Sequence, residues 1–376
     1  MKKIIYLISS LKGNGPNRVL LSMLEGIDKT KYDVYIISFL NDNDLNYLEI
    51  IKKKVNNVYL LNLSKKHHII TKGRKSVQSI VDTIYPDIIH SHGTLPDIVN
   101  AKIKTKSKKI TTIHDNMFED YLYHFGYIKG KLIIKWHLYY LKRFYKCICC
   151  SSSSYEILKR HLKNKTFIRN AIYKKERSIV EYNKVRNKIR AKYNINKDDI
   201  IYLFAGNLTK LKNVIQMVEK FNNNLNKNEF LLILGSGEME VLLKKTIKDK
   251  HIIFIGYTNK VNEYMCASDI YVSFSLSEGF SISILEALEN DNYLLISDIP
   301  SHKEVLTIDE NYYIGEYFNS DNFVNKKNNI IKHIKNKKSN DSLIFLKKYL
   351  TINNMMKKYE LFYDKQIIKE GEKTWS

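Results

Sequence analysis

Apolar and polar positions alternate along the chain in a pattern typical of strands followed by helices. Short, almost continuous apolar runs predict buried strands of a parallel sheet. They recur at 3–9, 32–40, 87–92, 109–113, 147–150, 200–205, 229–234, 252–255 and 269–274. Between them apolar residues return at helical spacing, as at Ile282, Leu285 and Leu288. Strands that alternate with helices predict an α/β fold built from Rossmann-like domains.

The 376 residues are enough for two domains of ordinary size. A charged, Asn-rich stretch without apolar periodicity interrupts the pattern near the middle of the chain. We therefore expect an N-terminal domain over 1–172, a linker region over 173–198 and a C-terminal domain over 199–342. A helical stretch with regularly spaced aromatic residues occupies much of the remaining segment, 343–376.

The first predicted strand is followed by a turn with two glycines, Gly13 and Gly15, and a helix that opens at Pro16. Strand, Gly-rich turn and helix form the phosphate-approaching start of a Rossmann-like domain. Gly13 and Gly15 are therefore candidates for contacting a ligand, although a tight turn accounts for them equally well. The full dinucleotide fingerprint is missing, which argues against a nicotinamide cofactor.

Three further patterns in the N-terminal half could carry chemistry. His114 follows the strand at 109–113, at the end where open α/β sheets bind ligands, and a core histidine is the alternative. Asp42-Asn43-Asp44 superficially matches a metal-binding D-x-D but lies in a polar cluster without the flanking strand expected of that motif. His90-Ser91-His92 has no third ligand nearby in sequence. We expect no metal at either position.

The formal charge of +23 predicts an anionic partner: nucleic acid, an anionic membrane surface or a phosphorylated substrate. The excess is heavy between Lys102 and Lys175, and over 126–144 lysines are interleaved with aromatic residues. Such a helix can lie on an anionic bilayer, or it can pack on the sheet with its lysines in water. Binding to nucleic acid explains only the charge, so we expect none.

The chain has no apolar run of the roughly 20 residues that a membrane span requires. The short apolar stretch after Met1-Lys2-Lys3 is typical of a strand and not of a signal peptide. We expect a cytoplasmic protein, with the inner face of the plasma membrane as its candidate docking surface.

The most informative stretch runs from Ser277 to Leu288 and holds Glu278 and Glu286, eight positions apart. A helix should begin near Ser281 or Ser283, which places Gly279 in a strand-to-helix turn. There the backbone can approach a ligand, and the first amides of the helix attract anions. The carboxylates could hold sugar hydroxyls or a ribose diol, whereas two solvated surface glutamates are the alternative.

This stretch resembles the E-x7-E motif of the retaining, GT-B-fold glycosyltransferases of family 4. The resemblance covers most of the chain, and its specific part lies between Ile200 and Val305. It extends to segments 206–213, 235–238, 252–257 and 296–305. It implies two Rossmann-like domains facing across a cleft, with the C-terminal helix crossing back to the first domain.

The activity that the resemblance implies is transfer of a sugar from a nucleotide-sugar, with UDP as the expected nucleotide. The acceptor would be a hydroxyl of a glycan or lipid-linked acceptor in cell-surface polysaccharide biosynthesis. The reaction would retain the anomeric configuration and need no metal. We expect no cofactor, because the nucleotide-sugar is a substrate.

The resemblance also implies roles for individual residues. His114 would orient the donor sugar, Glu278 would hold its hydroxyls, and Glu286 would hold the ribose. The remaining candidates would contact the diphosphate or the nucleotide, namely Lys212, Lys210, Gly235, Gly237, Gly279, Phe280 and Ser281.

One position departs from the family pattern, since Asn207 stands where the family has an arginine. An amide cannot stabilise a departing diphosphate as a guanidinium does. Either Lys210 compensates, or the enzyme is slow, or catalysis is lost. The alternative function is therefore a noncatalytic homologue that serves as partner or chaperone of an active transferase.

Overall fold

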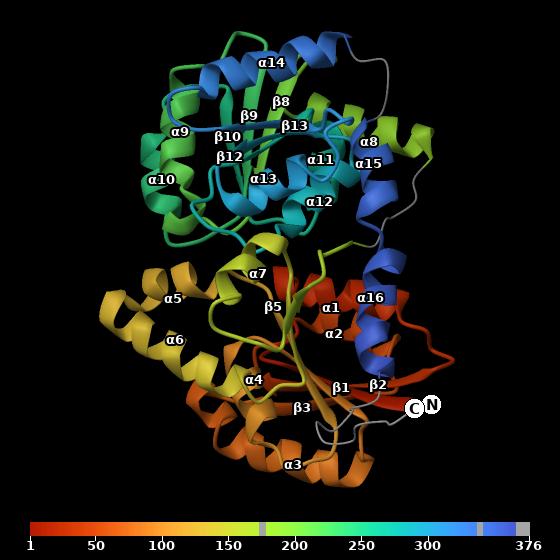
Figure 1. Cartoon of the computed structure of the whole chain (residues 1–376). Helices are drawn as coiled ribbons and strands as arrows, with labels where there is room; N and C mark the ends of the chain where they lie inside the picture. Colours follow the sequence, from red (N-terminus) through yellow and green to blue (C-terminus); the bar gives the residue numbers. More distant parts are fainter. Residues whose placement is uncertain (173–177, 337–340, 366–376) are drawn as a thin grey trace. The chain divides into compact units, whose positions relative to one another are not determined.

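The computed structural model describes residues 1–172, 178–336 and 341–365 (Figure 1). The chain divides into two compact units. The first comprises Met1–Ala171 together with the C-terminal segment from Ile352, and the second comprises Ile172–Thr351. Each unit is built on one parallel β-sheet, so the predicted α/β fold with two Rossmann-like domains is confirmed.

The first unit contains a seven-stranded sheet in the order β3-β2-β1-β4-β5-β6-β7. Its strands are β1 (Lys2–Ile8), β2 (Tyr32–Leu40), β3 (Asn57–Leu63), β4 (Ile88–His92), β5 (Lys108–Ile113), β6 (Lys146–Cys149) and β7 (Lys165–Phe167). Its α-helices are α1 (Gly15–Gly26), α2 (Leu45–Lys52), α3 (Lys72–Ile84), α4 (Thr94–Lys102), α5 (Met117–Phe125), α6 (Tyr127–Leu141), α7 (Ser152–Leu158) and α16 (Ile352–Asp364), and a 3-10 helix, η1, covers Lys66–Ile69. The two edge strands β3 and β7 were not predicted. The residues of both are mostly half-buried, and the apolar run in β3 is only four residues long, over 58–61.

The second unit repeats the same plan with six strands in the order β10-β9-β8-β11-β12-β13. Its strands are β8 (Ile200–Ala205), β9 (Glu229–Leu234), β10 (Ile252–Gly256), β11 (Ile270–Ser273), β12 (Tyr293–Ser297) and β13 (Gly315–Phe318). Its helices are α8 (Ile179–Lys192), the 3-10 helix η2 (Lys210–Lys212), α9 (Val214–Asn222), α10 (Glu240–Thr246), α11 (Val261–Ala267), α12 (Ile282–Glu289), α13 (Pro300–Leu306), α14 (Phe323–Asn336) and α15 (Asp341–Tyr349).

Each sheet has a point at which the strand order reverses, between β1 and β4 in the first unit and between β8 and β11 in the second. Both pairs are parallel, with Ile4 beside Ile88 and Ile270 beside Tyr202. Connections leave neighbouring strands toward opposite faces at such a point, and this opens a crevice outside their carboxyl ends. The fold therefore provides one ligand-binding position in each unit.

Helix α16 completes the first unit although it follows the second unit in sequence, and it lies beside α1 (Figure 1). The contact is close, because a Cβ at Gly26 would lie only 2.2 Å from Ile352 Cγ2. The single helical stretch expected in 343–376 is two helices, α15 in the second unit and α16 in the first. Residues 366–376 lie outside the described residues.

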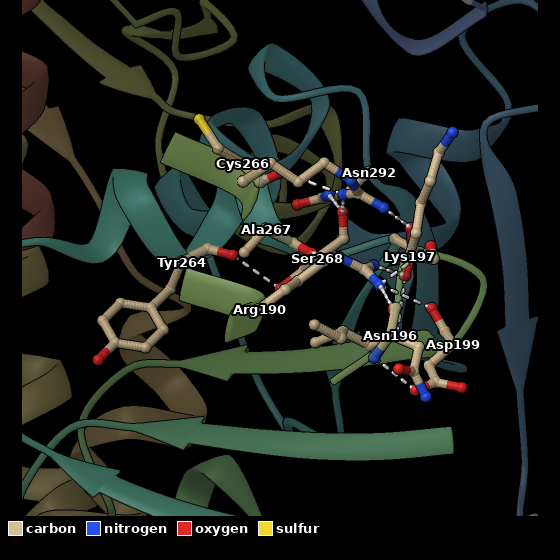
Figure 2. Close-up of polar contacts among 12 residues, drawn as sticks. Arg190, Asn196, Lys197, Asp199, Tyr264, Cys266, Ala267, Ser268 and Asn292 are labelled. Carbon is tan, nitrogen blue, oxygen red and sulfur yellow. Dashed lines mark hydrogen bonds and ion pairs between the residues drawn. The ribbon is translucent and has the colours of Figure 1, made fainter. Parts of the chain in front are cut away.

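The expected linker region, 173–198, contains helix α8, which belongs to the second unit. Residues 173–177 lie outside the described residues. The Asp269 carboxylate holds α8 by accepting hydrogen bonds from Arg186 at 2.5 Å and from Arg190 at 2.7 Å. Arg190 also donates to three carbonyls of the chain that follows α8, as Figure 2 shows. The buried Arg190 and the half-buried Arg186 therefore attach a helix whose sequence has little apolar periodicity.

Candidate functional site

The turn between β11 and α12 is formed by the stretch that holds Glu278 and Glu286. Helix α12 begins at Ile282 with Ser281 as its N-cap, so the predicted start of this helix is confirmed. Gly279 and Phe280 are buried in the turn, and Ser281 is half-buried. Glu278 thus lies in the connection that leaves the carboxyl end of β11, beside the strand reversal.

Glu278 is paired with Lys212, whose side chain comes from η2 after the neighbouring strand β8. Ser275 Oγ also donates a hydrogen bond of 2.8 Å to Glu278 Oε1. Burial alone raises the pKa of Glu278, but the charge of Lys212, the nearby His302 and hydrogen bonds from Lys212 and Ser275 outweigh it. The pKa of Glu278 therefore stays below its ordinary value. The carboxylate is ionised at neutral pH and has a cation beside it.

Glu286 lies on α12 and is half-buried. Both carboxylates of the motif lie close enough to the buried Tyr271 of β11 to influence its pKa. Burial raises the pKa of Tyr271, and the charges of Glu278 and Glu286 raise it further. The structure therefore brings both glutamates of the motif, with Lys212, to the carboxyl end of the second sheet.

His302 on α13 is a neighbour of this cluster to which the sequence pattern gave no role. Ser297 Oγ donates to Ser275 O at 2.6 Å, so its hydrogen is not available to His302. His302 Nδ1 consequently donates to Ser297 O at 3.0 Å, and Nε2 is left as an acceptor with no partner among the described residues. Burial lowers the pKa of His302 to about 4, so the imidazole is neutral. In the sequence, His302 belongs to segment 296–305, which resembles the family pattern, and nothing there pointed to this histidine.

Asn207 and Lys210 are exposed in the loop after β8. The carbonyl of Asn207 accepts from Thr209 N at 3.0 Å, and the backbone amide of Lys210 donates to Glu238 Oε1 at 3.4 Å. The position usual for arginine therefore carries an exposed amide, while the ammonium of Lys212 is the one that meets Glu278.

Gly235 and Gly237 allow the loop after β9 to lie against the loop after β8. A Cβ at Gly235 would lie 1.8 Å from Gly206 O, and one at Gly237 would lie 2.5 Å from Leu208 O. Gly235 also has a φ of +133°, which L-residues rarely adopt. Both glycines thus set the path of the backbone that carries Asn207 toward Lys212.

In the first unit a pocket of about 190 Å³ lies at the strand reversal between β1 and β4. His114 lines it, together with residues from the ends of β1, β4 and β5 and from helices α1, α4, α5 and α6. Gly13 lies in the turn before α1, and Gly15 is the first residue of that helix, with open space beside each. Asn14 and Pro16, next to them, line the pocket.

Three histidine rings stack from the buried sheet toward this pocket. The ring centroids of His90 and His92 are 4.6 Å apart, and those of His92 and His114 are 5.0 Å apart. His92 Nδ1 lies 2.8 Å from His114 Nε2, and His92 Nε2 has no partner among the described residues. Burial lowers the pKa of His114 to about 4 and, with the charge of His114, that of His90 to about 3. The stack is therefore neutral at physiological pH.

The two weak metal patterns have other contacts in the structure. Asp42 pairs with Lys12 at 2.5 Å, and Asp44 caps α2 by accepting from Tyr47 N at 3.0 Å. His90 is held between Tyr363, at 2.8 Å, and Thr112. In the described ranges no group of three or more His, Cys, Asp or Glu side chains is placed to hold a metal ion.

Helix α6 carries the basic, aromatic segment, and it packs beside α5. One side of α6 exposes large apolar side chains, Ile128 at 76%, Leu132 at 62% and Trp136 at 39%. The lysines and the arginine of this helix and its end are also exposed, namely Lys129, Lys131, Lys135, Lys142 and Arg143. No helix among residues 1–172, 178–336 and 341–365 is both long and apolar enough to cross a bilayer.

Two family models together match most of the chain. Residues 13–173 match the model described as Glycosyltransferase Family 4, and residues 185–344 match the model described as Glycosyl transferases group 1. The boundary between the two matches falls close to the boundary between the two compact units.

Named relatives and solved structures agree with these matches. The O-antigen biosynthesis glycosyltransferase WclY of Escherichia coli is 28% identical over 315 residues, covering 81% of this chain and 82% of the relative. The UDP-Gal:alpha-D-GlcNAc-diphosphoundecaprenol alpha-1,3-galactosyltransferase of Escherichia coli is 23% identical over 333 residues, covering 83% of each chain. The structure of Anabaena Alr3699/HepE in complex with UDP-glucose has a TM-score of 0.75 at 14% identity, covering 96% of this chain and 99% of that one. That last similarity is one of fold.

Proposed function

The chain belongs to the group 1 glycosyltransferases of the GT-B fold, and from this premise we propose what it transfers and where. The donor is a UDP-sugar, and the acceptor is a hydroxyl of a lipid-linked or other glycan in cell-surface polysaccharide biosynthesis. Transfer retains the anomeric configuration and uses no metal ion.

The observation that carries the proposal is the Lys212–Glu278 pair at the carboxyl ends of β8 and β11. A nucleotide-sugar offers each member of the pair a new partner, because its diphosphate can accept from the ammonium and its sugar hydroxyls can donate to the carboxylate. A cation held beside the leaving diphosphate stabilises charge that develops in the transition state. The departing phosphate would take the acceptor's proton.

Support for UDP and for the acceptor class comes from the relatives. The name of the galactosyltransferase gives UDP-Gal as its donor and a diphosphoundecaprenol-linked sugar as its acceptor. Anabaena HepE was crystallised in complex with UDP-glucose. WclY is named for O-antigen biosynthesis. Glu286 would hold the ribose diol and His114 the donor sugar.

The donor is tested by thermal unfolding of the full chain with UDP-, GDP- and ADP-sugars. A ligand that binds only the folded state at about 100 times its Kd stabilises it by about 2.7 kcal/mol. We expect UDP-sugars to raise Tm and Lys212→Ala to remove most of the shift. No shift with any nucleotide would reject donor binding and favour the noncatalytic alternative.

Two further measurements test the chemistry. The anomeric configuration of the product, read by NMR, distinguishes retention from inversion. Transfer that persists unchanged in excess chelator supports metal independence, whereas loss that is restored by a divalent ion would contradict it.

The place of action that we propose is an anionic membrane surface, which the exposed face of α6 contacts. Ile128, Leu132 and Trp136 would enter the interface while the neighbouring lysines meet lipid phosphates. In vesicle sedimentation we expect binding to phosphatidylglycerol and little to phosphatidylcholine. Replacing the three apolar residues by serine should reduce binding about tenfold or more, because each buries apolar surface. Val241→Ser with Leu242→Ser, on exposed apolar residues of α10, is the matched control.

A further inference from the structure

The pocket at the β1–β4 reversal has a charge composition unlike that of the chain. Lysine and arginine contribute 62 of the 376 residues, yet none of the described residues that line this pocket is either. Asp97, Asp115 and Asp120 line it instead, together with histidines. An anionic group entering the pocket would meet carboxylates and find no cation among these residues.

A chain of hydrogen bonds runs from the protein interior to this pocket. Asp97, only 1% exposed, accepts from Thr111 Oγ1 at 2.7 Å through Oδ1. Its other oxygen, Oδ2, lies 2.9 Å from His137 Nε2, and His137 Nδ1 lies 2.9 Å from Tyr121 OH. Tyr121 OH in turn is hydrogen-bonded to Thr94 Oγ1. The four side chains Asp97, His137, Tyr121 and Thr94 come from α4, α5 and α6.

The Asp97 carboxylate, at the inner end, gives this chain of hydrogen bonds a direction. Asp97 only accepts, so when the His137 ring carries a single hydrogen, that hydrogen lies on Nε2 and Nδ1 is an acceptor. Tyr121 then donates to His137, and Thr94 donates to Tyr121. Every hydrogen points inward, so Thr94 Oγ1 and Tyr121 OH face the pocket with lone pairs and with no hydrogen to offer.

We propose that Thr94 and Tyr121 are specificity-determining residues that accept hydrogen bonds from the hydroxyl groups of an uncharged sugar ring. Asp97 and His137 are positioning residues that fix the direction of those hydrogen bonds. The proposal rests on the proposed function and deepens it, because it defines the chemical class of sugar that this unit accepts.

The ligand class follows from the hydrogens. A sugar hydroxyl can donate to Thr94, whereas a carboxylate or phosphate oxygen cannot. His92, 4% exposed, also brings one nitrogen without a partner among the described residues, Nε2, to the same pocket. A neutral polyhydroxyl ring can satisfy such groups, and the pocket volume of about 190 Å³ is below the range for drug-sized ligands and suits one small ring.

Ligand-observed NMR titration of the full chain tests the ligand class. The probes are neutral methyl hexosides, glucuronate and a hexose phosphate, and UDP is titrated separately. We expect the neutral glycosides to bind best, and Thr94→Val and Tyr121→Phe each to weaken them about five- to tenfold with UDP binding unchanged. Tyr85→Phe, on a tyrosine 80% exposed and outside the pocket, is the matched control.

The Asp97→Asn variant tests the direction of the hydrogen bonds in this chain of side chains. Thr111 keeps the carbonyl of the new amide at its own position, so the NH2 group faces His137 Nε2 and forces the opposite tautomer. Tyr121 can then donate outward. Glycosides in which one hydroxyl is replaced by fluorine should bind the wild type poorly and lose less affinity in Asp97→Asn, because fluorine cannot donate.

Several outcomes would overturn the proposal: no binding of neutral glycosides, equal binding of the charged sugars, or wild-type affinity in Thr94→Val and Tyr121→Phe. If Asp97→Asn does not fold, the Tyr121 and Thr94 variants still decide. If the wild-type chain does not bind UDP, that result refutes the proposed function, independently of the sugar-binding results.

Discussion

The two units have the same strand order around their reversal points, and the side chains at those points differ in chemistry. At the second, the ammonium of Lys212 meets the ionised Glu278 beside a helix start. At the first, neutral histidines and carboxylates line the pocket, and no lysine or arginine is among its described residues. The difference matches the two ligands that we propose: a site that holds a cation suits a diphosphate, and a site of acceptors without a lysine or arginine suits sugar hydroxyls.

The backbones of the two Gly-rich turns differ as well. Gly235 in the second unit is required by contact with Gly206 O, whereas a Cβ at Gly13 in the first would meet no atom within 4 Å. The turn in the second unit is thus fixed by packing against a neighbouring loop. The turn in the first has room beside its glycines.

The largest expected effect is loss of sugar transfer when Lys212, the cation at the strand reversal of the second unit, is removed. Lys212→Ala should lower kcat about 10²- to 10³-fold, as loss of one donor to a developing oxyanion does elsewhere. Lys210→Ala, on an exposed lysine of the same 3-10 helix, should lower it far less. Steady-state kinetics with a UDP-sugar measures both. If Lys210→Ala had the larger effect, the role of diphosphate partner would pass to Lys210.

The next effect is on stability and compares the two turns. Gly235→Ala should destabilise the chain by about 3 kcal/mol or more, because its Cβ overlaps a carbonyl oxygen and its φ is positive. Gly13→Ala should change stability by less than about 0.5 kcal/mol. Denaturant unfolding measures both. Equal losses would show that the first turn is as constrained as the second.

The acid response should also separate the units. Burial lowers the pKa of His114 to about 4 and that of His90 to about 3, from 6.5 in an exposed imidazole. Between pH 6.5 and 4 the unfolded chain therefore binds more protons than the folded chain. Stability falls as pH is lowered through that window, by about 1 kcal/mol per pH unit for each histidine.

Hydrogen exchange at about pH 7 and about pH 5, followed by peptide, measures this response unit by unit. We expect the first unit, which contains the histidine stack, to lose more protection than the second, where His302 contributes alone among the described histidines with such a shift. His114→Asn should reduce the loss, and His67→Asn, on an exposed histidine, should not. Equal losses in both units would contradict the prediction.

Much of the fold could be predicted because the central strands of a parallel sheet are buried on both faces and appear as apolar runs. The start of α12 was predictable because Ile282, Leu285 and Leu288 recur at helical spacing. Helix α8 was missed because arginine pairs with Asp269 hold it in place of an apolar stripe, although Ser178 and Glu181 form a capping box that could have signalled its start. Edge strand β3 was missed because its apolar run, over 58–61, is short and flanked by asparagines, as suits a strand that is only partly buried.

The site was predictable residue by residue and not as an arrangement. The sequence indicated Glu278 and Lys212 separately, yet their pairing depends on β8 lying next to β11. His302 and the Asp97–His137–Tyr121 chain have no local pattern, since each contact joins residues distant in sequence. Such groups become visible only when the topology brings strand ends and helices together.

The smallest expected effect concerns Asn207, the exposed amide in the position where the family has arginine. Asn207→Arg would add a guanidinium to a site where Lys212 already provides one cation, so UDP-sugar affinity should rise about three- to tenfold. Isothermal titration measures it, with Asn213→Arg, after the same 3-10 helix, as control. A rise in affinity with little change in kcat means that Lys212 alone suffices for catalysis in the natural chain. Transfer that appears only in Asn207→Arg would instead show that the natural chain binds a donor without transferring its sugar. The two units would then differ only in the ligands that they bind, and the second unit of the natural chain would have no catalytic role.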